Sequence, residues 1–227
     1  MTVSRFDDVF DRDVWKERVA ELKEKEVVGA CFYTDGGYRK SYPHPNASWG
    51  IHSYFFTDKK PKRVSRYKLE YPTKERGYSN ETKERHNIVD SVKIFNASGL
   101  IQRVDATNNI AELLAVSLVL DLILETELIN TLKHVCIFSD SKYVLEQINL
   151  YLAKWKANGW KRTNGGEIQN LYYWKVIDSQ LTKLAEVDIE LIFEYRKGHE
   201  DFGNIIADAA CTLAIVNGIE QDQFCDE

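Results

Sequence analysis

Two short apolar runs in this chain each stop at an aspartate, and the second leads into helical patterns. The run VVGACFYTDGG, residues 27–37, is typical of a buried strand that ends at a Gly-Gly turn. The run HVCIFSD, residues 134–140, is typical of a parallel strand that stops at Asp140. The stretch after it repeats apolar residues every three or four positions, as an amphipathic helix does. Such a chain must cover a sheet with helices, which restricts it to the α/β class.

The remaining patterns complete a mixed sheet. ASWGIHSYFF, residues 47–56, alternates as an antiparallel neighbour of the first strand does, and a third strand is expected between residues 98 and 104. A fifth strand is expected within residues 189–199, and helices over residues 107–127, 141–155, 169–187 and 203–218. We therefore predict a mixed five-stranded sheet, three antiparallel strands and then two parallel ones, flanked by helices.

The chain divides into a large central part and two ends. Residues 5–26 have helical spacing, so residues 1–26 are expected to form an amphipathic helical extension. The domain is expected over residues 27–218, with Gly218 closing its last helix and residues 219–227 as a tail. Residues 57–97 are polar and show no sustained period, which predicts an insertion or long loop inside the domain.

Charge limits where nucleic acid could bind. The net charge is −5, whereas nucleic-acid-binding proteins are usually basic, so any such binding must be local. One candidate is a basic run in the insertion, for which a solvated loop is the favoured alternative: Lys59, Lys60, Lys62, Arg63, Arg66 and Lys68. In the other, lysines alternate with tryptophans: Lys154, Trp155, Lys156, Trp160, Lys161 and Arg162.

Cysteine usage and hydropathy indicate the compartment. The four cysteines are far apart and form no zinc-ligand pattern: Cys31, Cys136, Cys211 and Cys225. The N-terminus has no apolar core of a signal peptide, and no apolar run approaches the ~18 residues that a membrane span needs. We expect a reduced, cytoplasmic protein that does not enter a membrane.

Four acidic residues stand among apolar neighbours, which is unusual for carboxylates: Asp35, Glu112, Asp140 and Asp208. If the first and fourth strands are adjacent, Asp35 and Asp140 leave the sheet at one edge, and the helical acids could join them. Clustered carboxylates repel one another and favour Mg²⁺ or Mn²⁺, and two such ions can hydrolyse a phosphodiester. Taken singly, each acid would more often be a cap, a turn residue or a solvated residue near the end of an element. Spacing alone therefore goes no further than a metal-dependent phosphoryl-transfer enzyme.

Five motifs in order make the chain similar to the type 1 ribonuclease H family. They are FYTDGG, ATNNIAELLAV, FSDSKYVLEQI, NGWKR followed by Trp174, and YRKGH with GNIIAD, and they touch most of residues 27–217. The resemblance implies the ribonuclease H fold. It also implies Mg²⁺-dependent endonucleolytic hydrolysis of the RNA strand of RNA/DNA hybrids, which leaves 5′-phosphate and 3′-hydroxyl ends.

The resemblance also implies roles for residues of the catalytic centre. Asp35, Glu112, Asp140 and Asp208 match the family's metal-binding carboxylates, which hold two Mg²⁺ ions, with Mn²⁺ as a substitute. His199 matches the histidine of a mobile loop that assists proton transfer or product release, a role suited to an imidazole. Without the resemblance, His199 would be taken for a surface loop residue.

Substrate contacts are implied on both strands of the hybrid. Asn108 and Asn109 match an asparagine pair that contacts the minor groove and the RNA 2′-hydroxyls, and Thr107 and Asn204 fall near phosphate or active-site contacts. Trp155, Trp160 and Lys161, with Trp174 nearby, match a basic protrusion that grips the DNA strand. The alternatives are that residues 107–109 cap a helix and that the tryptophans pack in the core.

Two other functions are compatible with these patterns. One is a hybrid-binding protein without catalysis, which four retained, self-repelling acids argue against. The other is a nuclease of the same fold that acts on another nucleic acid, against which the asparagine pair and the KGH motif argue. We expect a monomer, and the sequence predicts no protein partner.

Overall fold

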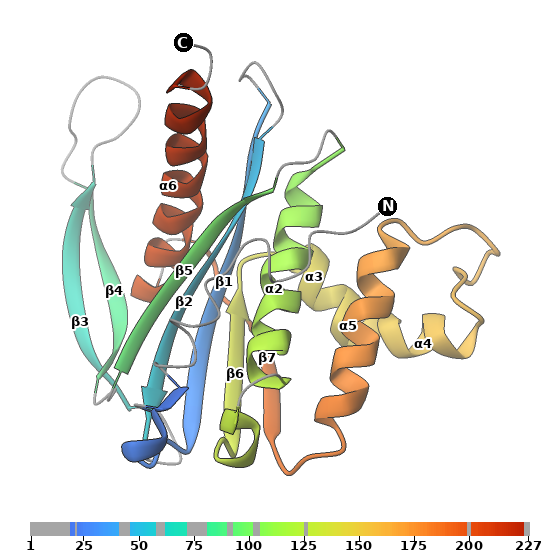
Figure 1. The fold of residues 1–227 in the computed structure, drawn as a ribbon, viewed down its shortest axis with the longest axis horizontal. Coiled ribbons are helices and arrows are strands. Elements are labelled where there is room, and N and C mark those ends of the chain that lie inside the picture. Colours follow the sequence, from blue (N-terminus) through green and yellow to red (C-terminus); the bar gives the residue numbers. More distant parts are fainter. Residues whose placement is uncertain are drawn as a thin grey trace.

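The computed structural model describes residues 19–20, 22–40, 46–57, 62–71, 81–89, 93–101, 105–124, 127–198 and 201–224. Its main sheet has the strand order β5-β2-β1-β6-β7 (Figure 1). The strands are β1 (Gly29–Arg39), β2 (Asn46–Phe56), β5 (Lys93–Ile101), β6 (His134–Ser139) and β7 (Glu190–Tyr195). The β1–β2 and β2–β5 pairs are antiparallel, and the β1–β6 and β6–β7 pairs are parallel. The mixed five-stranded sheet of the sequence analysis is thus confirmed.

Helices cover both faces of this sheet. They are α2 (Asn108–Leu124), α3 (Lys142–Glu146), α4 (Leu152–Ala157), α5 (Leu171–Leu184) and α6 (Phe202–Phe224). Helix α2 packs against β1, β2 and α5, and α6 packs against β1, β2 and β5. Neighbouring residues of β1 approach these two helices, Gly36 approaching α2 and Gly37 approaching α6, so the helices lie on opposite faces. No helix in the described part of the chain is long and apolar enough to cross a membrane.

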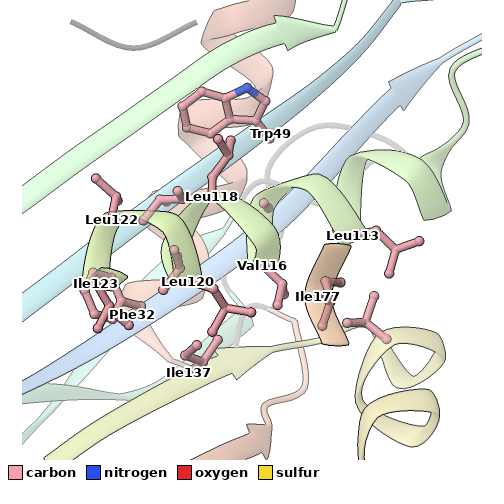
Figure 2. Packing of buried hydrophobic residues seen from close by; sticks show 14 of the residues in the cluster. Phe32, Trp49, Leu113, Val116, Leu118, Leu120, Leu122, Ile123, Ile137 and Ile177 are labelled. Carbon is pink, nitrogen blue, oxygen red and sulfur yellow. The ribbon is translucent and has the colours of Figure 1, made fainter. Parts of the chain in front are cut away.

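The main hydrophobic core lies between α2, α5 and the sheet. Figure 2 shows Leu118, Leu120 and Ile123 of α2 among Phe32, Trp49 and Ile137 of the strands, and Ile177 of α5 beside them. Fully burying one such side chain contributes about 1.5–3 kcal/mol. Helix α2 is apolar around most of its surface and packs against both the sheet and α5. This packing fixes the position of the helix that carries Glu112.

The expected irregular insertion contains a β-hairpin. Strands β3 (Lys62–Tyr71) and β4 (Glu81–Val89) pair antiparallel as a separate two-stranded sheet, which lies beside α6 (Figure 1). Strand β5 begins at Lys93, earlier than the expected residue 98. The interpretation as an irregular loop was wrong because backbone pairing needs no apolar alternation, and KRVSRYKLEY has too few apolar residues to show one.

Three glycines do not end the elements that they were expected to end. Strand β1 continues through Gly36 and Gly37, which pair with Trp49 and Ser48 of β2, so the Gly-Gly turn is wrong. Helix α6 runs past Gly218 to Phe224, because one glycine inside a helix costs only about 1 kcal/mol. The helix expected over residues 141–155 is present and contains a π-helical turn, Gln147–Tyr151.

Parts of the terminal predictions fall outside the described residues. Of the helical extension 1–26, residues 19–20 and 22–24 are helical, and Val19 and Leu22 are buried in the main core. Cys31, Cys136 and Cys211 form no disulfide among the described residues, whereas Cys225 lies outside them. The domain boundaries at residues 27 and 218 stay predictions.

Candidate active site

The parallel pairing of β1 with β6 brings two aspartates together. The last paired residues of the two strands are Thr34 and Ser139, and Asp35 and Asp140 follow directly. Thr34 Oγ1 also donates a hydrogen bond to the Phe138 carbonyl, 3.3 Å away, which ties the strands together beside this point. The predicted meeting of Asp35 and Asp140 at one edge of the parallel strands is therefore present.

A glycine in β1 lets α2 bring Glu112 to the same place. A Cβ atom at Gly36 would lie 2.4 Å from the Glu112 nitrogen, so only glycine allows this approach. The Gly36 N–H donates to Asp35 Oδ1 at 2.9 Å. Glu112 is 4% exposed, and its Oε2 atom has no hydrogen-bond partner among the described residues. A buried carboxylate oxygen without a partner is energetically costly, which indicates that the site awaits a ligand.

Helix α6 carries Asp208 and is anchored close to β1 and β2. The Cys211 thiol donates to the Asp35 carbonyl at 3.2 Å, and Ser48 Oγ donates to the Cys211 carbonyl at 2.8 Å. A Cβ atom at Gly50 would lie 2.2 Å from the Ala207 carbonyl oxygen, so β2 also needs a glycine under this helix. Cys211 follows Asp208 by three residues, so this anchor fixes the helix turn that holds the fourth acid.

The acids lie close enough to perturb one another. One carboxylate oxygen from each of Asp35, Glu112 and Asp140 lies within 4.8 Å of the others. Burial, and then the negative charges of Asp140 and Asp208, raise the pKa of Asp35 to about 7. Burial, and then Asp35 and Asp140, raise the pKa of Glu112 well above its usual range. An all-oxygen set under mutual repulsion fits a hard divalent cation such as Mg²⁺ or Mn²⁺.

These acids line a pocket of about 360 Å³ that opens between α2, α6 and the carboxyl end of the parallel strands. Its other polar walls include Arg39, Asn108, Asn204 and Thr212. Asn204 is 4% exposed, and neither atom of its amide has a hydrogen-bond partner among the described residues. The pocket thus holds unsatisfied acceptors and donors around a cluster of carboxylates.

A match to a known family identifies the protein that carries this arrangement. The RNase H family model matches residues 73–215, more than half of the chain. The chain belongs to the RNase H family. The matched segment contains Glu112, Asp140 and Asp208, and the structure adds Asp35 to them through β1.

Curated relatives and solved structures agree with this assignment. Ribonuclease H of Francisella philomiragia is 36% identical over 115 residues, 49% of this chain and 66% of that protein. Ribonuclease H of Ruthia magnifica is 34% identical over 112 residues, 49% of this chain and 70% of that protein. The chain thus spans about two thirds of the length of these relatives.

Two solved structures show the likeness in fold. The solution structure of the PFV RNase H domain has a TM-score of 0.51 at 23% identity, over 82% of this chain and 93% of that one. The crystal structure of LC9-RNase H1, a type 1 RNase H with the type 2 active-site motif, has a TM-score of 0.52 at 16% identity. It covers 83% of this chain and 71% of that one.

The other residues expected at the RNase H centre are distributed around the pocket. Thr107 precedes α2, and its Oγ1 accepts from the Ile110 N–H at 3.3 Å, so the expected helix cap is present. Asn108 lines the pocket and donates a hydrogen bond to Glu112, while Asn109 is half-buried in the same helix turn. His199 lies outside the described residues, directly after Gly198, which lines the pocket.

The tryptophans expected in the protrusion behave differently from one another. Trp174 is fully buried in the core, which confirms the packing alternative for this residue. Trp155 and Trp160 are half-buried, and Trp155 packs edge-on against Trp174 with ring centroids 5.7 Å apart. Lys161 is exposed in the loop after α4.

A second pocket of about 510 Å³ lies beside α4. It includes Trp155 and Arg162 of the predicted basic surface, whereas its Tyr143 and Tyr151 were missed by sequence reasoning. Its walls include Tyr143, Tyr151, Trp155, Arg162 and Asn164. Tyr151 stacks on Trp155 with centroids 6.1 Å apart, and the Lys154 ammonium lies 5.5 Å from the Tyr151 ring centre. Tyr151 had no distinguishing sequence pattern, because its place in the π-helical turn determines where it points.

Proposed function

We propose that this RNase H family member hydrolyses the RNA strand of RNA/DNA hybrids endonucleolytically, leaving 5′-phosphate and 3′-hydroxyl ends. The observation that carries the proposal is the cluster of Asp35, Glu112 and Asp140, whose oxygens lie within 4.8 Å of one another inside a polar pocket. Ribonuclease H relatives and the family match support the substrate class. The foamy viral protease-reverse transcriptase was solved with an RNA/DNA hybrid, and 20% of that chain is similar to 82% of this one at a TM-score of 0.51 and 22% identity.

Asp35, Glu112, Asp140 and Asp208 are proposed to hold two Mg²⁺ ions, with Mn²⁺ able to replace them. The unpartnered Glu112 Oε2 and the raised pKa values of Asp35 and Glu112 fit a site that is completed by positive charge. Bound there, the ions supply an activated water and a stabilised leaving oxygen for phosphodiester hydrolysis.

The chain's own residues then hold the substrate and move protons. The buried amide of Asn204 has no partner among the described residues, so it can donate to and accept from the scissile phosphate or water at the pocket wall. His199 is proposed to transfer a proton or to assist product release, because it follows Gly198 at the pocket and an imidazole titrates near neutral pH.

The start of α2 is proposed to read the RNA strand. Thr107 and Asn108 are exposed and Asn109 is half-exposed where α2 begins, so the first turn of this helix is accessible to a nucleic acid. Amide side chains there can donate to and accept from 2′-hydroxyl groups, which distinguish RNA from DNA.

The second pocket is proposed to receive the DNA strand. Aromatic faces of Tyr151 and Trp155 beside Arg162 offer the combination of stacking and positive charge that suits a nucleic-acid backbone. Trp160 and Lys161 extend this surface, and Lys175 lies 5.7 Å from the Trp160 ring centre. The chain is further proposed to act as a monomer in the cytoplasm, on the grounds given by its sequence.

A substrate panel tests the proposed function. The protein is incubated with an end-labelled RNA/DNA hybrid, the matching DNA duplex and the matching RNA duplex, each with Mg²⁺, Mn²⁺ or EDTA. We expect internal cuts in the RNA strand of the hybrid alone, and none in EDTA. Tight hybrid binding without cleavage in either metal would support a non-catalytic binder. Cleavage of DNA instead would mean that the fold acts on another substrate.

A further inference from the structure

Arg39 shares a strand face with the catalytic aspartate. It is the last residue of β1, where it pairs with Asn46 of β2, and strand alternation puts Asp35, Gly37 and Arg39 on one face. This face meets α6, because a Cβ atom at Gly37 would lie 3.3 Å from Cys211 Cβ. Arg39 consequently lines the same pocket as the carboxylates, and it is the one cationic residue among the described residues of that wall.

The Arg39 guanidinium is not used to neutralise the acids. The side chain is half-buried, yet it makes no ion pair or hydrogen bond with any residue in the part of the chain that the structure describes. It is also absent from the charges that act on Asp35 and Glu112, whose pKa values stay raised. A partly buried charge without a partner is costly, which indicates that an anion from outside completes its interactions.

A nucleic-acid phosphate is the anion that this position fits. Guanidinium groups bind phosphates in a bidentate manner. The scissile phosphate belongs at the carboxylates, and the four residue steps along β1 from Asp35 to Arg39 span about 13 Å. A substrate strand whose scissile phosphate lies at the carboxylates can therefore present a different phosphate to Arg39 on the wall of the same pocket.

We propose that Arg39 binds a backbone phosphate of the RNA strand that flanks the scissile phosphate, and so sets affinity and register in a pocket that otherwise repels phosphate. This inference rests on the proposed cleavage of RNA/DNA hybrids. No feature of the sequence alone singles out Arg39, because the first strand was expected to end at Gly36–Gly37, before this residue.

Steady-state cleavage of a hybrid by Arg39→Ala and Arg39→Lys tests the contact. We expect Arg39→Ala to raise KM by roughly tenfold with little change in kcat, and Arg39→Lys to recover part of this loss. A plot of log KM against log salt concentration should lose about one unit of slope, because one phosphate contact is removed. Lys133→Ala is the matched control, since it removes one exposed cation just before β6, at the opposite end of that strand from Asp140.

Neutral methylphosphonate linkages locate the phosphate. They are placed one at a time along each strand of the hybrid. One linkage beside the cut site in the RNA strand should raise KM for the wild-type protein and leave KM of Arg39→Ala unchanged. Equal effects in both proteins at every linkage, coupling only to the DNA strand, or an Arg39→Ala variant that behaves like Lys133→Ala would overturn the inference.

Binding separates this inference from the proposed function. Hybrid affinity of the same proteins is measured by fluorescence anisotropy in Ca²⁺, where no turnover is required. A wild-type protein that never cuts hybrids contradicts the proposed function. The salt dependence of binding then still shows whether Arg39 contacts a phosphate. A wild-type protein that cuts normally, with no change in KM, binding or slope for Arg39→Ala, contradicts this inference alone.

Discussion

Asp35 and Glu112 are held where negative charge is unfavourable. Both are largely buried, both lie near other carboxylates, and both have raised pKa values. Groups that face like charges in a low-dielectric pocket keep their protons to a higher pH than exposed carboxyl groups do. The carboxylate cluster therefore costs stability in the absence of metal, and this cost depends on pH.

The pH dependence of unfolding tests this cost. Because the pKa of Asp35 is raised to about 7, the folded state binds more protons than the unfolded state from about pH 4 to pH 7. Stability is thus fully present below the unfolded pKa and falls as pH rises through the folded value. Between pH 5 and pH 8 we expect this residue to lower the free energy of unfolding by about 2 kcal/mol.

Urea unfolding in EDTA at the two pH values measures this change for the wild-type protein and for Asp35→Asn. The variant should lose distinctly less stability, because its amide does not ionise. Asp188→Asn, which alters an aspartate whose side chain is 96% exposed, should behave like the wild type. An unchanged pH dependence in Asp35→Asn would contradict the assigned environment.

At the residue scale, the sequence predicts the acids better than their neighbours. Asp35, Glu112, Asp140 and Asp208 could be found because each interrupts an apolar pattern. Arg39, Cys211 and Tyr151 could not be found, because their positions depend on which elements meet in three dimensions. Thr107, Asn108 and Asn109 lie at the start of α2, and their contact with a substrate stays a prediction.

At the scale of elements, apolar periodicity identified the five strands of the main sheet and its helices. It failed for the β3–β4 hairpin, whose polar sequence leaves backbone pairing without a signature. It also failed at Gly36–Gly37 and Gly218, since glycine permits a turn without requiring one. Glycine is required at position 36 within the strand because α2 occupies the space that a side chain of this residue would fill.

The surface beside α4 gives a prediction at this scale. Tyr151→Ala should weaken hybrid binding by about 1–3 kcal/mol through lost stacking, with little change in stability because Tyr151 is 42% exposed. Tyr172→Ala is the matched control, since Tyr172 is 55% exposed on α5 and does not line the second pocket. Fluorescence anisotropy with a labelled hybrid measures both, and equal affinities for the two variants would contradict a DNA-strand role for this pocket.

At the scale of the whole molecule, metal binding and folding should be coupled. The four acids come from β1, α2, the end of β6 and α6, so an ion held between them links elements that are distant in sequence. Ligand that binds the folded state at 100 times its Kd stabilises by about 2.7 kcal/mol.

Thermal unfolding with and without Mg²⁺ or Mn²⁺ measures this coupling. We expect the metal to raise Tm, and to raise it more at pH 8 than at pH 6, because raised carboxyl pKa values make protons compete with the ion. Asp35→Asn should lose most of the metal-dependent increase. A Tm that does not respond to either ion would argue against a metal centre.

The most direct test of the central claim compares two aspartate-to-asparagine variants in Mg²⁺-dependent cleavage of an RNA/DNA hybrid. Asp140→Asn removes one charge from the carboxylate cluster, and Asp188→Asn removes one charge from the exposed surface. The account predicts that Asp140→Asn loses at least about 100-fold in kcat while remaining folded, and that Asp188→Asn cleaves like the wild type. Full cleavage of the RNA strand by a folded Asp140→Asn protein would contradict the assignment of this cluster as the catalytic centre.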